Sequence, residues 1–278
     1  MPLVINTNVA SLNAQKNLST SNGLLSKSVE RLSSGLRVNS ARDDAAGLAV
    51  SSKLRAQIAS ISVAIRNSQD GISLAQTTEG GLNEMGNILT RMRELSEQSA
   101  NGTLGIKERN ALDAEYKQLY DEINRISKVT EFNGVRLLDQ SYSIPGGALM
   151  LQVGFQNTSN DVITLSGMSG IDASTLSIQS TINSQTGAQA NLSLLDQAIE
   201  TVATTRGNLG AIMSRLDSTI ANLRVSHENL SSADSAIRDA DFALEASVFI
   251  RNQILVQAGT SMVAQANMLP QTALTLLQ

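Results

Sequence analysis

Apolar residues recur at helical spacing along the first half of the chain. The first stripe runs from Leu18 to Leu36 in steps of seven, four, three and four residues, which places its members on one face of a helix. Two further stripes at the same spacing cover residues 54–75 and 112–126. We therefore expect three amphipathic helices before residue 135.

The boundaries of these helices are marked by capping residues. Ser40-Ala41-Arg42-Asp43-Asp44 predicts the start of the second helix, with Ser40 as its cap and carboxylates in its first turn. Asn101-Gly102 and Asn133-Gly134 follow the second and third stripes. Because Asn and Gly favour the backbone conformation that ends a helix, these pairs predict the two helix ends.

The second half of the chain keeps one apolar register for much longer. Steps of three and four residues from Leu192 to Leu269 give 23 positions, of which 17 are apolar. A heptad pattern kept over this distance predicts a coiled coil, which spans roughly 100 Å if it is unbroken. Between the two halves, residues 140–188 contain two short β-prone runs separated by Gly and Asn. We expect one or two hairpins there, within a mainly α, rod-like fold.

Charge and composition exclude several classes of function. The 278 residues include 21 Lys and Arg against 25 Asp and Glu, a formal net charge of −4, so the basic field that nucleic acids require is absent. There is no Cys and a single histidine, His227, which removes thiolate sites and His–His metal pairs. The first residues do not form a basic and then apolar leader, and no run of about 18 apolar residues occurs; we expect neither a secretory signal nor a membrane span.

The two ends of the chain carry no charge. Residues 1–15 and 252–278 contain no charged side chain, and the second stretch includes ten large apolar residues. An exposed helix in water normally has a charged face, and a lone helix buries too little apolar surface to offset the entropy of ordering. We therefore expect both ends to become ordered when other subunits cover them.

Both halves of the chain also contain blocks that occur together in one family. In the first half they include Ile5-Asn6-Thr7-Asn8, Leu32-Ser33-Ser34-Gly35-Leu36-Arg37, Asp43-Asp44-Ala45-Ala46-Gly47-Leu48-Ala49, Gln98-Ser99-Ala100-Asn101-Gly102 and Glu131-Phe132-Asn133-Gly134. In the second half they include Ile237-Arg238-Asp239-Ala240-Asp241, Gln257-Ala258-Gly259-Thr260-Ser261 and Ala264-Gln265-Ala266-Asn267. Through these blocks, about 1–140 and 190–278 resemble bacterial flagellin.

The resemblance implies a topology for the fold. The N- and C-terminal halves form a long antiparallel coiled-coil rod with a small β-hairpin region in the middle. An inner terminal domain of 1–42 plus 235–278 lines the filament channel. An outer rod domain comprises 43–139 plus 189–234, and a β/loop segment, 140–188, belongs to it. Because only about 50 residues separate the halves, we expect a minimal flagellin without large outer domains.

The resemblance also implies function and partners. It implies a structural subunit that self-assembles into the extracellular flagellar filament and is exported unfolded through the flagellar type III secretion channel. Its expected partners are other flagellin subunits, a secretion chaperone at the C-terminal helix, and the filament cap and hook–filament junction proteins, with no nucleic acid, membrane or cofactor. The alternative is a junction adaptor of the same family, which does not polymerise without limit.

Two sets of residues are candidates for interaction sites. The polymerisation set comprises apolar residues of the terminal helices: Leu18, Leu25, Val29, Leu32, Leu244, Val248, Leu255, Ala258, Met262 and Leu269. The second set matches the Arg, Leu, Gln and Glu through which some flagellins contact the Toll-like receptor for flagellin, here Arg91, Leu95, Gln98 and Glu115. The spacing of the first three predicts one helix face, which packing between subunits would also explain.

We expect no catalytic or metal site. His227 has no second imidazole or nucleophile to act with, so a structural role beside the core is the better interpretation. Asp43-Asp44 and Asp239 with Asp241 are better explained as helix caps or intersubunit ion pairs than as metal ligands. The zinc-protease insert of some flagellins needs His-Glu-x-x-His, which this sequence lacks.

Overall fold

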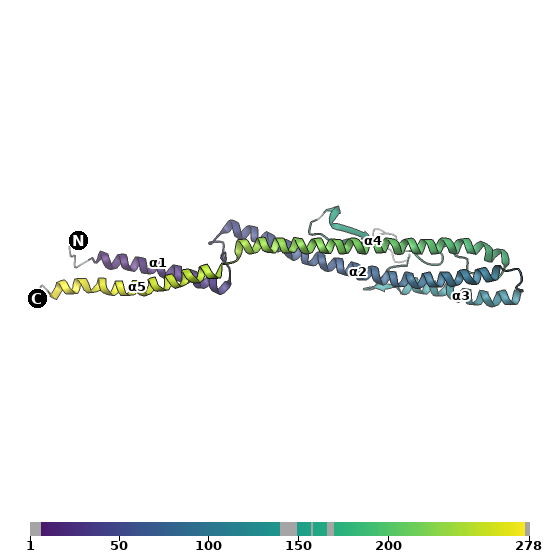
Figure 1. Cartoon of the computed structure of the whole chain (residues 1–278), viewed down its shortest axis with the longest axis horizontal. Helices are drawn as coiled ribbons and strands as arrows, with labels where there is room; N and C mark the ends of the chain where they lie inside the picture. The colour runs from purple at the N-terminus through teal and green to yellow at the C-terminus, as the bar shows by residue number, and fades with distance from the viewer. Residues whose placement is uncertain (1–6, 140–148, 157, 166–169, 276–278) are drawn as a thin grey trace. The chain divides into compact units, whose positions relative to one another are not determined.

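The computed structural model describes residues 7–139, 149–156, 158–165 and 170–275 (Figure 1). Its helices are α1 (Val9–Ser34), α2 (Ala45–Ala100), α3 (Ile106–Val129), α4 (Gln185–Arg238) and α5 (Phe242–Thr275), with one 3-10 turn, η1 (Ser159–Asp161). Its strands are β1 (Glu131–Phe132), β2 (Val135–Arg136), β3 (Leu149–Gln152) and β4 (Val162–Leu165). The mainly α fold predicted from the sequence is confirmed.

The chain forms two compact units. One consists of Met1–Ile58 with Glu228–Gln278, and the other of Ala59–His227. Both boundaries fall inside helices, since α2 and α4 each contribute to both units. The boundaries expected from the sequence, after residues 42 and 234, lie closer to the helix breaks.

Two helix boundaries differ from the sequence prediction. The second helix starts at Ala45, where the Asp44 side chain accepts a hydrogen bond from the Gly47 N–H (2.9 Å). Ser40 instead belongs to the preceding turn, because its hydroxyl bonds to Asp43. The third helix ends at Val129, and Asn133-Gly134 forms the turn of the β1–β2 hairpin. Both turn residues have positive φ, 51° and 76°, which suits Asn-Gly in a tight hairpin.

The long C-terminal coiled coil is also interrupted. In α4 the predicted register is confirmed, because Leu195, Val202, Leu209 and Leu216 are all buried. The helix stops at Arg238, and α5 starts at Phe242 after three non-helical residues. Asp241 caps the new helix by accepting hydrogen bonds from the N–H groups of residues 243 and 244. The apolar pattern of residues 192–269 is therefore divided between two helices, and the coiled coil predicted there does not run unbroken.

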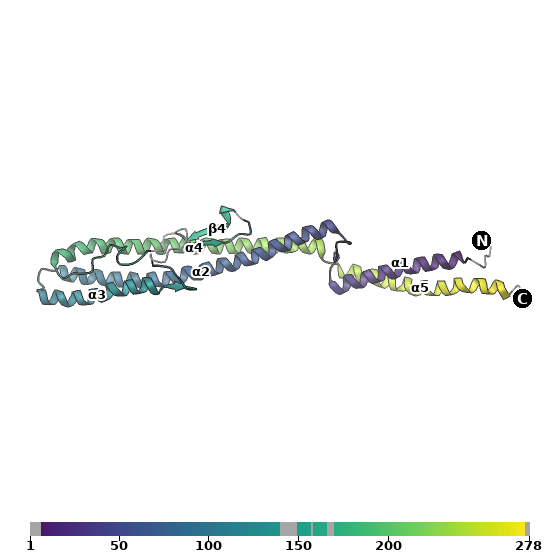
Figure 2. The ribbon, with the colours of Figure 1, turned by 180° about the vertical axis from the view of Figure 1, so that it is seen from behind.

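The expected hairpin in the middle region is present. β3 and β4 pair antiparallel, from Leu149 opposite Leu165 to Gln152 opposite Val162. The hairpin lies beside α4 in both views of the molecule (Figures 1 and 2). Ile163 and Val153 fix it there by packing around Leu216. The glycines expected to flank it at 146–147 and 167–169 lie outside the described residues.

The core of the second unit lies between α2, α3 and α4. Its members on these three helices include Leu82, Met85, Leu89, Met92, Leu95, Tyr116, Ile123, Leu195, Val202 and Leu209. Within the described residues, α2 is the one helix that is long and apolar enough to cross a membrane by length and composition, criteria that the core helices of soluble proteins also meet. The stretch of α2 that meets these criteria is 17% buried, whereas Leu82, Met85 and Leu89 of the same helix pack into this core.

A buried polar network fixes the three core helices in register. The Asn191 side-chain amide of α4 donates to the hydroxyl of Tyr116 on α3 (2.6 Å), and Ser96 of α2 lies 3.4 Å from the same nitrogen. On the loop side, the Ile182 N–H donates to the Asp113 carboxylate (2.7 Å). All these side chains are buried. A shift of any of the three helices along its axis would leave buried polar groups without hydrogen-bond partners, which would lower the free energy of unfolding.

This network predicts a loss of stability at alkaline pH. Burial raises the pKa of Tyr116 from 10.0 to about 12, although the Asn191 hydrogen bond opposes the shift. The unfolded chain therefore loses the phenolic proton before the folded chain does, and stability falls as the pH rises from 10 to 12. We expect about 3 kcal/mol of unfolding free energy to be lost over this interval. Urea unfolding followed by circular dichroism measures it, and Tyr116→Phe should remove this part of the pH dependence.

Candidate assembly surface

Helices α1 and α5 form an antiparallel pair with a single register. The Asn8 side-chain amide donates to the Ala266 carbonyl (2.7 Å), and the Ser11 hydroxyl bonds to the Asn267 side chain (2.7 Å). At the other end of the pair, the Arg31 guanidinium lies 3.4 Å from the Glu245 carboxylate. The two helices lie side by side in both views of the molecule (Figures 1 and 2).

The contact face of this pair, which we call the seam, is made largely of small and polar residues. On α1 the less exposed residues of the seam are Ser11, Ala14, Leu18, Ser21, Leu25, Ser28 and Leu32, and on α5 they are Glu245, Val248, Asn252, Val256, Gly259, Val263 and Ala266. They recur every three or four residues, as in a coiled coil. At Gly259 the helices are so close that an added Cβ would lie 3.1 Å from Leu18 Cδ1.

Many large apolar side chains of the two helices lie outside the seam. On α5, Phe242, Leu244, Ile254 and Met262 are 69, 66, 59 and 61% exposed. On α1 and the rest of α5, Val9, Leu12, Leu24, Val29, Ile250, Leu255 and Met268 are also exposed. We call these eleven residues the outward face. Because large apolar side chains lose free energy when they are exposed to water, these residues are candidates for contact with another molecule.

The outward face arises from a change of register at the break between α4 and α5. The apolar register of α4 would continue in α5 at Leu244, Leu255 and Met262, but the seam uses the residue after each of these positions. A shift of one residue rotates a helix face by about 100°. The stripe that is buried in α4 is therefore turned toward solvent in α5.

The structure divides the predicted polymerisation residues into two groups. Leu18, Leu25, Leu32 and Val248 are half-buried in the seam. Val29, Leu244, Leu255, Ala258 and Met262 are exposed, while the side chain of Leu269 lies outside the described part of the structure. The predicted set followed a single register and so omits Phe242, Ile250 and Ile254, although Ile254 is one of the ten large apolar residues that the uncharged tail contains. The set also omits the small residues of the seam, whose spacing of three and four was the available signal.

The two helix breaks at the base of this pair are tied together. Leu36 and Asp239 form an isolated antiparallel bridge, and the Arg37 N–H donates to the Arg238 carbonyl (2.6 Å). Gly35, with φ of 71°, ends α1 in a left-handed conformation and bonds to the Arg31 carbonyl. These backbone contacts therefore hold the break after α1 directly beside the break before α5.

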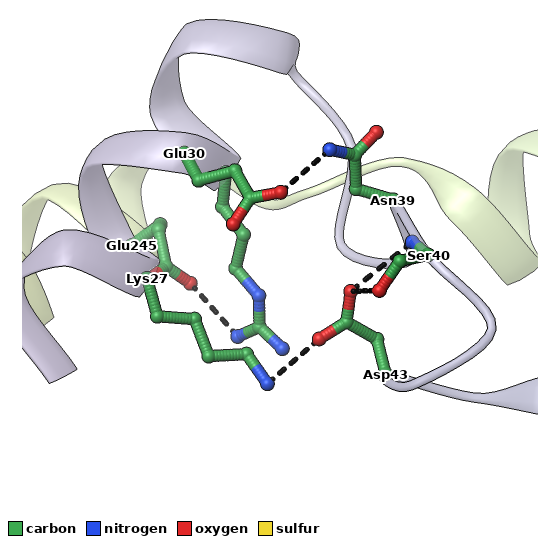
Figure 3. Close-up of polar contacts among 7 residues, drawn as sticks. Lys27, Glu30, Asn39, Ser40, Asp43 and Glu245 are labelled. Carbon is green, nitrogen blue, oxygen red and sulfur yellow. Dashed lines mark hydrogen bonds and ion pairs between the residues drawn. The ribbon is translucent and has the colours of Figure 1, made fainter. Parts of the chain in front are cut away.

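Polar side chains fasten the segment between α1 and α2 (Figure 3). The Lys27 ammonium lies 2.8 Å from the Asp43 carboxylate, and the Asn39 amide donates to Glu30 (2.7 Å). Hydrogen bonding with Lys27 and with Ser40 holds the pKa of Asp43 far below its ordinary value. Asp43 therefore remains ionised and paired at mildly acidic pH.

The structure separates the four candidate receptor residues. Arg91 is exposed and forms ion pairs with Glu115 of α3 (2.9 Å) and with Glu94 (2.9 Å). Gln98 is exposed, whereas Leu95 is 1% exposed and belongs to the core. The spacing predicted one helix face for Arg91, Leu95 and Gln98, and in the subunit Leu95 lies at the core side of that face, about 40° around the helix from Arg91.

The acidic pairs have structural partners. Asp44 and Asp241 cap α2 and α5, Asp43 pairs with Lys27, and Asp239 accepts a hydrogen bond from Ser235. Within the described part of the chain, no three His, Asp or Glu side chains are grouped to hold a metal ion. His227 is half-buried and lines a shallow pocket with Arg224 and Ile65.

The sequence of this chain matches those of known proteins over nearly its whole length. Residues 5–143 match the model of the bacterial flagellin N-terminal helical region, and residues 192–277 match that of the C-terminal helical region. The chain belongs to the bacterial flagellin family. A flagellin of Halalkalibacterium halodurans is 44% identical over 279 residues, which cover 99% of this chain and all of the relative. A flagellin of Bacillus subtilis is 41% identical over 304 residues, with 99% of both chains covered.

Solved structures of related proteins agree with the helical fold. The crystal structure of Bacillus cereus flagellin is 35% identical and covers 57% of this chain and 88% of its own length, with a TM-score of 0.50. A hook-associated protein of Vibrio parahaemolyticus, 15% identical with a TM-score of 0.57, shares the fold over 71% of this chain and all of its own length. Flagellins are components of the extracellular flagellar filament, so membership assigns this chain a structural role there.

Proposed function

We propose that this flagellin polymerises with copies of itself through the outward face of α1 and α5. The observation that carries the proposal is the number of large apolar side chains that this helix pair leaves exposed. Small and polar residues such as Ser11, Ser28 and Asn252 are buried in the seam, whereas Leu244 and Met262 are more than half exposed. A helix pair of this kind gains most of its apolar burial from neighbours outside the pair.

The energetic scale supports this mode of assembly. Burying one large apolar side chain yields about 1.5–3 kcal/mol, and the outward face contains eleven such residues. Association requires an estimated 4–15 kcal/mol for lost translational and rotational freedom, so several of these residues must be covered at once. The part of α5 from residue 252 onward carries no charge, and therefore its burial needs no desolvation of ionised groups.

The experiment that tests the proposal compares the full chain with a truncation that lacks residues 252–278. We expect the full chain, seeded with filament fragments, to form filaments visible by electron microscopy and to sediment. The truncated chain should stay monomeric, because it lacks most of the outward face of α5. Thermal unfolding of the truncation checks that the second unit, Ala59–His227, is still folded.

The alternatives predict different outcomes. If neither chain polymerises under seeding, a junction adaptor that ends after a limited ring becomes the better interpretation. If both chains polymerise equally, α5 does not carry the assembly surface. The flagellin blocks such as Asp43-Asp44-Ala45-Ala46-Gly47-Leu48-Ala49 favour the filament subunit.

Family membership supports several further interactions as proposals. We infer export as an unfolded chain through the flagellar type III channel, with a secretion chaperone covering the apolar α5 before assembly. The filament cap and the hook–filament junction proteins are the expected neighbours at the two ends of the polymer. For the Toll-like receptor for flagellin, Arg91, Gln98 and Glu115 supply an exposed polar surface, with Leu95 beneath it as part of the core.

A further inference from the structure

The chain contains three Asn-Gly pairs, and the structure sets one of them apart. They are Asn22-Gly23, Asn101-Gly102 and Asn133-Gly134. In such a pair the backbone nitrogen of glycine can attack the side-chain carbonyl carbon of asparagine, because glycine has no Cβ to obstruct the approach. All three asparagines are exposed, so access does not distinguish them. The first pair lies within α1 and the third is held in the β1–β2 turn, whereas Asn101-Gly102 lies in the loop between α2 and α3.

The side chain of Asn101 has a hydrogen-bond donor at the oxygen that this attack would charge. The Thr103 N–H donates to Asn101 Oδ1 (3.1 Å). Attack on Cγ turns this oxygen into an oxyanion, and a donor that is in place before the reaction stabilises the developing charge. The same hydrogen bond keeps the side chain turned toward the backbone of residues 102 and 103, where the attacking nitrogen is.

A buried guanidinium acts on the attacking nitrogen itself. Arg109 is 9% exposed, and its Nη2 donates to the backbone carbonyl of Asn101 (2.8 Å). This carbonyl and the Gly102 nitrogen belong to one peptide group, so the charge left when the nitrogen loses its proton is shared with the carbonyl oxygen. A positive charge bonded to that oxygen therefore favours the ionised, nucleophilic form of the nitrogen.

We propose that Asn101-Gly102 is a self-modifying site, at which the fold promotes formation of a succinimide. The Gly102 nitrogen gives its proton to hydroxide and forms a bond to Asn101 Cγ. The bond from Cγ to Nδ2 then breaks, and the nitrogen takes a proton from water and leaves as ammonia. Water opens the five-membered ring at either carbonyl, which yields aspartate or isoaspartate. The new carboxylate lies beside Arg109, whose buried Nε has no hydrogen-bond partner among the described residues.

The test compares the three pairs in the folded and in the unfolded chain. Peptide mass spectrometry of the full chain, incubated at mildly alkaline pH, measures the aspartate and isoaspartate formed at each pair. The same incubation in urea gives the rate that each local sequence has without the fold. We expect folded Asn22 and Asn133 to react at least about tenfold more slowly than in urea, whereas folded Asn101 reacts at least as fast as in urea. If folded Asn101 is slowed as much as the other two, the proposal is overturned.

Substitutions of Arg109 test the role of its charge. Arg109→Gln should lower the rate at folded Asn101 about tenfold and leave the rate in urea unchanged, while Arg109→Lys should restore part of the rate. The matched control is Arg125→Gln on the exposed side of the same helix, which should have no effect. An unchanged rate in Arg109→Gln, or an equal loss in the control, would contradict activation by Arg109.

A further variant tests the nucleophile without disturbing the fold. In Gly102→Ala the nearest neighbour of the added Cβ would be Gln185 Nε2, 3.7 Å away, which is an ordinary contact. We expect this chain to fold normally, as circular dichroism would show, and to form less product at Asn101 in both conditions. Unchanged product would mean that the Gly102 nitrogen does not attack. If Arg109→Gln fails to fold, the comparison of the three pairs in the original chain still decides the proposal.

Discussion

A chain that carries both Leu255→Lys and Met262→Lys should fold normally but fail to form filaments. Both side chains belong to the outward face, 47 and 61% exposed, so lysine is readily solvated in the free subunit. In an assembly the two ammonium groups would be buried in a segment without acidic residues, and buried unpaired charges are costly. We expect the concentration required for assembly to rise at least about 100-fold. Sedimentation of seeded samples measures it.

The matched control exchanges the same two residues without introducing charge. A chain with Leu255→Met and Met262→Leu keeps the apolar volume of the surface, and such swaps are well tolerated. It should assemble at close to the original concentration. Equal assembly of the lysine variant would show that this part of α5 does not contact a second copy, while equal loss in the control would indicate a fault in folding instead.

Replacing Leu95 by alanine should strongly destabilise the second unit. The side chain is 1% exposed in the core between α2, α3 and α4, and truncating a buried leucine typically costs about 2–5 kcal/mol. Urea unfolding followed by circular dichroism gives the change in unfolding free energy. The control is Gln98→Ala, three residues further along the same helix and exposed, for which we expect a change within about 0.5 kcal/mol.

This pair of variants also separates two roles for Leu95. A residue that contacts a receptor directly changes receptor binding without changing stability. A core residue changes stability, and its effect on binding follows from the altered position of Arg91 above it. A stability change below about 0.5 kcal/mol for Leu95→Ala would contradict the core placement.

The sequence was sufficient to predict those parts of the fold in which a single helix face meets a single core. The register of α4 was predicted correctly because Leu195, Val202 and Leu209 repeat without a break and all face the same core. The end of α2 at Ala100 also follows from Asn101-Gly102. Local hydrogen bonding was harder to anticipate at the start of α2, where Ser40 and Asp44 are both good caps. Asp44 takes the role because Ser40 bonds to Asp43.

The assembly surface could be predicted only in part. The absence of charge in residues 252–278 predicts a segment that other subunits cover, but the face that α5 buries against α1 could not be derived from the heptad pattern. Three non-helical residues before α5 change the phase of the helix, and the size of that change depends on backbone angles that no apolar pattern encodes. The seam was missed because Ser11, Ser28 and Gly259 are not apolar, although their size permits the close approach of α1 and α5.

The bridge between the two helix breaks has a mechanical consequence. Where α4 ends and α5 begins, the chain lacks the continuous ladder of hydrogen bonds that stiffens a helix, so under tension this point extends more easily than the helices on either side. The Arg37 N–H bonded to Arg238 and the Ala240 N–H bonded to Gly35 join this point to the other strand of the chain. Tension applied to α5 is therefore transmitted to α1 through these backbone hydrogen bonds.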